Sequence, residues 1–272
     1  VGNKYKNQSW DGKDLMPISR SLFNFDINYQ LRDKYLIAVF YAINTFNYGY
    51  ENKKGLLYTQ PISINMIRTR IGLSPYLRYK YRGGDSNSKI KEYIQIMANK
   101  GIINIHSIMK STDDDNDNLF IISYNNKREK ASYFLISPEN HNALYSIKNE
   151  GDRITSMAIL YAIGYSTIRE SNNAKDSDKE FRNAVKGYIC KKTLTNLGKE
   201  IGIKSRDTLS KYFMQMEKHK IIAFYKVKFF NKRGFQYHYV NYTDIGKLKA
   251  YLYNEIDKEY NKEYIIERFI ED

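Results

Sequence analysis

The sequence predicts a helix-dominated α+β fold in which one structural unit occurs twice. Two short segments recur: Tyr-Ala-Ile at 41–43 returns at 161–163, and Ile-Gly-Leu at 71–73 returns as Ile-Gly-Ile at 201–203. Five further positions recur at a constant offset, namely Tyr93, Ile94, Met97, Ile102 and Ile103 as Tyr212, Phe213, Met216, Ile221 and Ile222. Each copy ends in two strand-like runs around a polar turn, so the repeated unit reads helix, helix, helix, hairpin.

Composition favours a polyanionic partner. The 272 residues carry 44 Lys and Arg against 30 Asp and Glu, a formal charge of +14, and cations gain affinity for nucleic acid by releasing counterions. A Lys-rich, ribosome-associated protein from an AT-rich genome would share this composition. The single cysteine, Cys190, excludes an internal disulfide framework and a Cys-based zinc site. Without an apolar run near ~20 residues or a signal peptide, the predicted location is the cytoplasm, with no membrane partner.

The first copy is expected to follow an N-terminal arm at 1–30 and to fill residues 31–149. Periodicity predicts a helix over 32–47, a short strand over 56–59 and a second helix from Gln60-Pro61 to Arg70, ended by Gly72. A third helix, capped by Asp85, Ser86 or Ser88, runs to Asn99. Strands are expected at 102–108, 119–124 and 133–136, and a closing helix at 138–148.

The second copy is expected to fill residues 150–272, with the boundary at 150–152. Its helices are predicted at 153–165, 192–200 and 205–218, with a polar insertion at 166–190. Strands at 221–230 and 235–242 flank the turn Asn231-Lys232-Arg233-Gly234, which is a strong hairpin signal. Thr243 is expected to cap a helix over 244–260, and residues 264–270 to add another helical turn or two.

The third helix of each copy fits the reading helix of a winged helix-turn-helix domain. Such a helix needs an apolar face for anchorage and a polar face for bases, because the DNA major groove accepts an α-helix. In the second copy Leu209, Phe213 and Met216 form the apolar stripe. The hairpin then serves as a wing that touches the DNA backbone. The alternative is that these are ordinary solvated helix faces.

The candidate DNA-binding residues belong to a basic loop, the two reading helices and the second wing. They are Arg78, Lys80, Arg82, Lys89, Lys91, Gln95, Ser205, Arg206, Thr208, Ser210, Lys211, Gln215, Lys226, Lys228, Lys232 and Arg233. The tip of the first hairpin is acidic, with Asp113, Asp114, Asp115 and Asp117. That wing therefore points away from DNA or serves a protein contact; a bound cation is the less favoured alternative.

The sequence contains little that indicates catalysis. We therefore predict that the protein is not an enzyme and has no catalytic residues, metal or cofactor. His106, His141, His219 and His238 are scattered, and neither a His-hydrophobe-His motif nor a phosphate-binding Gly-Lys-Ser/Thr loop occurs. Tyr237-His238-Tyr239 looks metal-like, but a histidine between tyrosines on a strand is more often a packing residue or a phosphate contact. The 26 tyrosines read as core and strand packing rather than as a stacking platform for single strands.

A tandem of winged helices, each with a trailing helix, resembles the replication initiator proteins of theta-replicating plasmids. The resemblance covers about residues 30–260 and rests on architecture; the repeated Tyr-Ala-Ile and Ile-Gly-Leu/Ile elements are not specific to that family. It implies binding to repeated origin sequences, recruitment of the host initiator and helicase, and a homodimer or monomer–dimer equilibrium. The basic loop at 74–87, the insertion at 166–190 and the acidic first wing depart from the pattern, leaving open whether the first module binds DNA or dimerises.

The predicted function is sequence-specific binding of double-stranded DNA to start replication of a plasmid or mobile element. A winged-helix transcriptional regulator, such as a repressor of a phage or mobile element, uses the same modules and is the main alternative. A nicking enzyme, a tyrosine recombinase and a protein-binding scaffold are the rivals from other classes.

Overall fold

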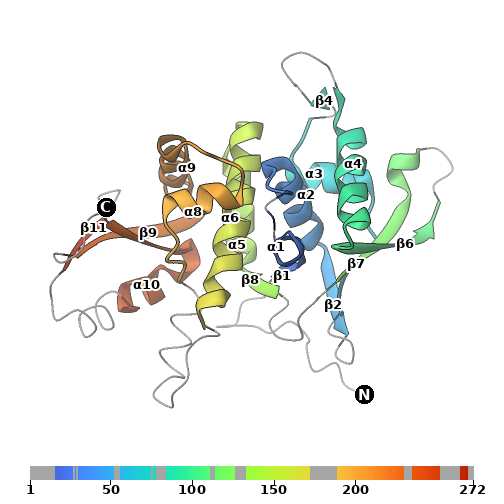
Figure 1. The fold of residues 1–272 in the computed structure, drawn as a ribbon. Helices are drawn as coiled ribbons and strands as arrows, with labels where there is room; N and C mark the ends of the chain where they lie inside the picture. Colours follow the sequence, from blue (N-terminus) through green and yellow to red (C-terminus); the bar gives the residue numbers. More distant parts are fainter. Residues whose placement is uncertain are drawn as a thin grey trace. The chain divides into compact units, whose positions relative to one another are not determined.

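The computed structural model describes residues 16–26, 28, 30–51, 56–74, 76–77, 84–110, 114–125, 133–171, 189–229, 235–251 and 264–268. Over these residues the chain is α+β and helix-dominated, with small antiparallel sheets (Figure 1). It forms two compact units. Unit 1 comprises Val1–Leu135 and Asn149–Ala158, and unit 2 comprises Ile136–Lys148 and Ile159–Asp272.

Three capped helices carry the core of unit 1. They are α2 (Lys34–Asn44), α3 (Ile64–Ile71) and α4 (Ser86–Asn99). Asp33, Ser63 and Asp85 cap them in turn, each side chain accepting a hydrogen bond from a backbone N–H of the first turn. Satisfying these otherwise unpaired donors fixes where each helix begins. The predicted second helix therefore starts at Ile64, three residues beyond Pro61.

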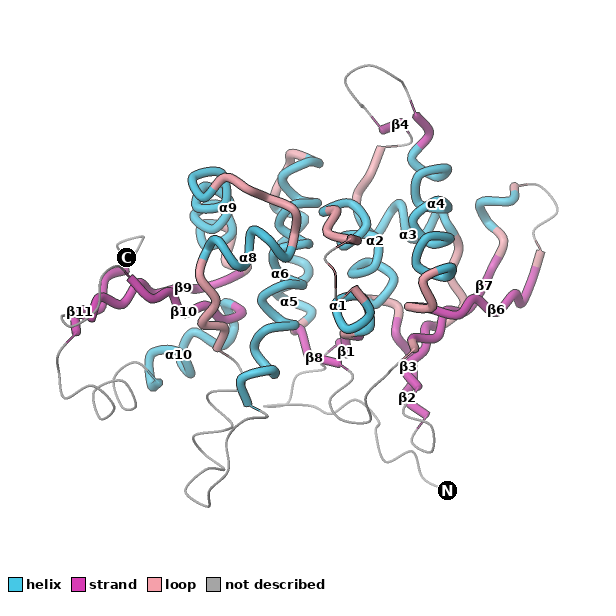
Figure 2. The backbone as a smooth tube through the Cα atoms, viewed as in Figure 1, coloured by secondary structure: helices cyan, strands magenta, loops and turns pink. Residues whose placement is uncertain are grey.

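The sheet of unit 1 has the order β2-β3-β7-β6 and is antiparallel throughout. Figure 2 shows its strands in magenta. Its strands are β2 (Asn47–Glu51), β3 (Leu56–Thr59), β6 (Ile103–Met109) and β7 (Leu119–Tyr124). A 3-10 turn, η1 (Asp115–Asp117), precedes β7. Two-residue strands β4 (Tyr76–Leu77) and β5 (Gly84–Asp85) pair within the predicted basic loop.

The segment predicted as an arm belongs in part to the folded core. Strand β1 (Met16–Ser19) pairs with β8 (Tyr133–Ile136) and leads into helix α1 (Ser21–Phe25). Ile18 and Leu22 are completely buried. This segment has no sustained sequence period, so its burial is set by contacts with distant residues.

Unit 2 opens with α5 (Pro138–Ala143) and η2 (Leu144–Ser146), followed by the long helix α6 (Glu150–Ser171), which starts in unit 1. Helices α8 (Leu194–Glu200) and α9 (Arg206–Lys218) come next, capped by Thr193 and Ser205. The hairpin of β9 (Ile222–Phe229) and β10 (Phe235–Asn241) follows, then η3 (Tyr242–Asp244) and α10 (Ile245–Tyr251). Most predicted elements of this copy are thereby confirmed.

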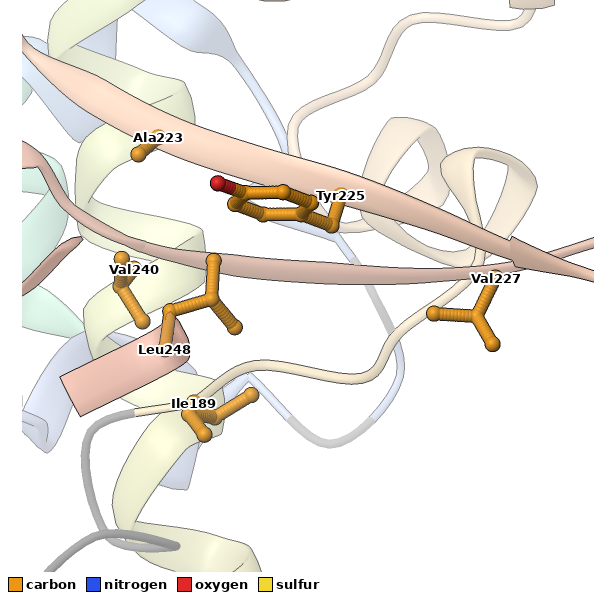
Figure 3. Close-up of a cluster of buried hydrophobic side chains, with 6 residues drawn as sticks. All are labelled: Ile189, Ala223, Tyr225, Val227, Val240 and Leu248. Carbon is orange, nitrogen blue, oxygen red and sulfur yellow. The ribbon is translucent and has the colours of Figure 1, made fainter. Parts of the chain in front are cut away.

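Alternating side chains of β9 and β10 build a core on each face of the sheet. On one face Phe213 of α9 packs against Phe224 and Tyr239, with ring centroids 6.0 and 4.8 Å apart. On the other lies a cluster of Ile189, Ala223, Tyr225, Val227, Val240 and Leu248 (Figure 3). Because Leu248 belongs to α10, that helix packs on the face opposite α9.

The end of the chain differs from the prediction. The expected helix over 244–260 is observed as η3 and α10 up to Tyr251, and residues 252–263 lie outside the described part. Residues predicted to add helical turns form instead strand β11 (Tyr264–Arg268), which pairs antiparallel with β9. The order β10-β9-β11 thus makes β9 the central strand, and this long-range pairing overrides the local helical pattern.

The sequence repeat extends to backbone conformation. Gly72 and Gly202 follow the second helices with φ of 72° and 74°, and Gly101 and Lys220 follow the third helices with φ of 67° and 57°. The residue after each of these four donates its backbone N–H to the carbonyl five residues earlier. For example, the Leu73 amide lies 3.1 Å from the Arg68 carbonyl, and the Ile203 amide lies 2.8 Å from the Gly198 carbonyl. These are left-handed C-caps that satisfy terminal carbonyls. Both copies therefore end the same two helices in the same way.

Candidate nucleic-acid interface

Helix α9 is anchored by one face. The Ser205 hydroxyl oxygen accepts the Thr208 amide at 3.2 Å, which starts the helix there. Leu209, Phe213 and Met216 are at most 1% exposed and hold the helix against the sheet. This stripe was predicted from the sequence and is confirmed.

Half of the exposed side chains of α9 are cationic. Six of its side chains are exposed: Arg206, Asp207, Thr208, Lys211, Met214 and Lys218. Lys204, two residues before the helix, is exposed as well. A helix that is apolar on one side and presents basic groups on the other can approach a polyanion without losing its anchorage.

The sheet extends this basic surface. Nη2 of Arg206 lies 3.4 Å from the hydroxyl oxygen of Tyr237, to which it donates. Tyr237 stands directly opposite Lys226 in the β9–β10 register, so their side chains share a face. Lys228, exposed, lies two residues further along the same strand. The start of α9 and the basic strand thus adjoin at Arg206 and Tyr237. We use the name α9/β9 face for the cations on and next to these two elements: Lys204, Arg206, Lys211, Lys226 and Lys228.

Two residues of this surface were not among the predicted DNA-binding residues, and three predicted residues are partly buried or already hydrogen-bonded. Lys204 was overlooked although it lies immediately before the cap, and Tyr237 was read only as a packing residue. Ser210 and Gln215 are half-buried, and the Ser205 hydroxyl is engaged in capping. The wing-tip residues Lys232 and Arg233 lie outside the described residues.

The corresponding face of α4 is less basic. Lys89 forms an ion pair with Glu92 at 2.7 Å and also lies over the Tyr93 ring. Gln95 donates to Asn99 at 2.7 Å, while Lys91 is exposed. The predicted loop cations Arg78, Lys80 and Arg82 lie outside the described residues. Two of the residues predicted to contact DNA, Lys89 and Gln95, therefore interact with neighbouring side chains of the same helix.

The acidic turn η1 lies beside the starts of α3 and α4. Asp117 accepts from Asn65 of α3 at 2.7 Å, and Asn65 accepts in turn from Asn87 of α4 at 2.9 Å. The pKa of Asp114 is lowered chiefly because the Asn116 amide donates to its carboxylate, and Asn65 and Lys91 act in the same direction. The acidic charge is thus held on the helical side of unit 1, close to Lys91.

The histidine that lies between two tyrosines on β10 is buried. His238 is 1% exposed, and burial lowers its pKa to about 3, with Lys191 adding to the shift. It is therefore uncharged near neutral pH and is a packing residue. No group of three or more His, Cys, Asp or Glu that could hold a metal occurs in the described ranges. No described helix is both long and apolar enough to cross a bilayer.

Comparisons with known proteins provide no family for this chain. No family model matches it, and neither a curated protein nor a solved structure does. The geometry and charge of the chain's own residues are therefore the basis for inferring its function.

Proposed function

We propose that this chain is a sequence-specific double-stranded DNA-binding protein that starts replication of a plasmid or mobile element. The observation that carries the proposal is the α9/β9 face, where exposed cations of a well-anchored helix continue onto an adjoining strand. DNA binding needs this arrangement, because a groove-reading helix must be flanked by phosphate contacts that fix its register.

Two tandem winged-helix modules are part of the proposal, and strand bridging supports them. In unit 1 Ile62, just before α3, exchanges both backbone hydrogen bonds with Phe120 of β7 at 2.9 Å. In unit 2 Cys190, just before α8, does the same with Tyr239 of β10 at 2.9 Å. In each unit a residue ahead of the second helix thus pairs with the second hairpin strand, as the first strand of a winged helix would.

The proposed mechanism is positional. Helix α9 enters the major groove with Arg206 and Lys211 toward base edges, while Lys226, Lys228 and the wing tip neutralise phosphates. Unit 1 contributes through Lys91 and the basic loop. The bound protein then nucleates an assembly, whose proposed members are a second copy of the chain and the host initiator and helicase.

The alternative within the same class is a transcriptional regulator. Both functions use the same contacts and differ in the site occupied. Footprinting on DNA flanking the gene separates them: directly repeated sites beside an AT-rich segment indicate initiation, and a palindrome over a promoter indicates regulation.

The test compares two pairs of substitutions on a duplex selected from a random library. Arg206→Ala with Lys211→Ala should weaken binding to the selected duplex at least about tenfold more than binding to random duplex, since base contacts discriminate by about 1–3 kcal/mol each. Lys232→Ala with Arg233→Ala should weaken both about equally. If both pairs of substitutions reduce the preference for the selected duplex over the random duplex equally, α9 is not the reading helix.

The experiment needs two controls. Lys249→Ala on α10, a helix packed on the opposite sheet face, removes a charge away from the α9/β9 face and should change neither affinity much. Incubation with supercoiled DNA and Mg²⁺ should leave the DNA intact. A nicked or covalently attached product would instead indicate an enzyme.

A further inference from the structure

Met214 of α9 is exposed but carries no charge with which to bind a phosphate. Asp207, Lys211, Met214 and Lys218 follow one another at intervals of four, three and four residues, so they form a single stripe along the helix. All four are exposed, and Met214 is 38% exposed. A large apolar side chain therefore stands in water in the middle of a charged row, on the helix proposed to read DNA.

The first copy has a different residue at this place. The constant offset that relates Tyr93 to Tyr212 relates Gln95 to Met214, and Gln95 is exposed on α4. The buried anchors of the two helices are alike, with Ile94 and Met97 matched by Phe213 and Met216. The exposed stripes are not alike, so the two helices share their anchorage and differ in what they present.

The groups that each base exposes in the major groove determine what a methionine can contact there. Thymine is the one standard base that displays a methyl group in that groove, and apolar side chains contact it. A flexible, polarizable thioether suits such a contact. Glutamine, the residue of the first copy, pairs instead with the N6 and N7 atoms of adenine.

We infer that Met214 is a specificity-determining residue that contacts the C5 methyl group of a thymine in the target of unit 2. The inference rests on the proposed function, because it assigns a base to the helix proposed to read DNA. It adds that the two modules read different bases at equivalent positions, Gln95 favouring adenine and Met214 favouring thymine.

The experiment removes the methyl group from the DNA rather than the side chain from the protein. A duplex selected with the full-length protein is remade with deoxyuridine in place of each thymine in turn, which deletes one methyl and keeps every hydrogen-bonding group. At one position the wild-type affinity should fall roughly fourfold, the factor that corresponds to burial of one methyl-sized group. Wild-type binding that is insensitive at every position would overturn the inference.

Two variants then assign the effect to the side chain. Met214→Ala should bind the thymine and uracil duplexes equally, and Met214→Gln should select adenine at the sensitive position. Met109→Ala, a matched truncation of a 64% exposed methionine in unit 1, should keep the wild-type sensitivity. Methyl discrimination that persists in Met214→Ala would overturn the assignment. If the wild type enriches no sequence and shows no salt-dependent duplex binding, the proposed function itself fails.

Discussion

Gly72 and Arg153 depend on each other at the end of α3. Nε of Arg153 donates to the Ile71 carbonyl at 3.0 Å, and its Nη2 donates to the Gly72 carbonyl. The guanidinium thus meets the negative end of the helix dipole. A Cβ on Gly72 would lie 2.6 Å from Nη2, and the φ of 72° already disfavours any other residue. Gly72 is therefore required both by its backbone and by its neighbour.

Comparing Gly72→Ala with Gly101→Ala should separate these two requirements. Gly101 has φ of 67° and nothing within 4 Å of a built Cβ, so its substitution should cost about 1–2 kcal/mol of unfolding free energy through the backbone alone. Gly72→Ala should cost more, because displacing Arg153 also weakens two hydrogen bonds worth about 1 kcal/mol each. Urea denaturation measures both, and equal losses would contradict the role given to Arg153.

At the scale of elements, η1 and α4 carry opposing charges in one unit. Asp115 and Asp117 of η1 and its capping residue Asp114 are exposed, and Lys91 is exposed on α4. The hydrogen bonds from Asn87 to Asn65 and from Asn65 to Asp117 tie the acidic turn to the two helices. The acidic tip consequently reduces the attraction that unit 1 can exert on phosphates.

Neutralising η1 should therefore strengthen DNA binding. Asp114→Asn, Asp115→Asn and Asp117→Asn together should raise affinity severalfold at low salt, and the gain should shrink as salt is raised, because exposed charges are screened within about 10 Å at 0.1 M. Fluorescence anisotropy at several salt concentrations measures this. The Lys249→Ala protein provides the reference for a charge change elsewhere. An unchanged affinity would mean that unit 1 does not approach the duplex.

For the whole molecule, helix α6 decides where the first unit ends. Residues 153–167 are all buried, and unit 1 includes the helix only as far as Ala158. Ile154 and Met157 are at most 1% exposed, and Arg153 holds the end of α3. A division at residue 150, placed from the change in sequence pattern, would remove these groups from unit 1.

A fragment of residues 1–160 should therefore be more stable than a fragment of residues 1–148. Each large apolar side chain lost from the core removes about 1.5–3 kcal/mol, a large share of the ~5–15 kcal/mol that stabilises a typical domain. Circular dichroism in urea should give a higher midpoint for the longer fragment. Coincident midpoints would show that the start of α6 adds nothing to unit 1.

Local patterns determined most elements before any tertiary contact was considered. Helices α2, α4, α8 and α9 and both hairpins were predicted because apolar spacing, capping side chains and glycine C-caps act within a few residues. The anchored stripe of α9 followed from the same spacing. The repeat made each prediction in one copy a check on the other.

Tertiary structure alone decided the non-local features. Pairing of β11 with β9, burial of residues 18–23 and the sharing of α6 between units all depend on segments far apart in the chain. At the candidate nucleic-acid interface, the Arg206–Tyr237 contact and the position of η1 beside Lys91 likewise come from packing. Sequence periodicity records which face of an element is apolar; which distant partner covers that face is set by complementary shape and charge, which no local window contains.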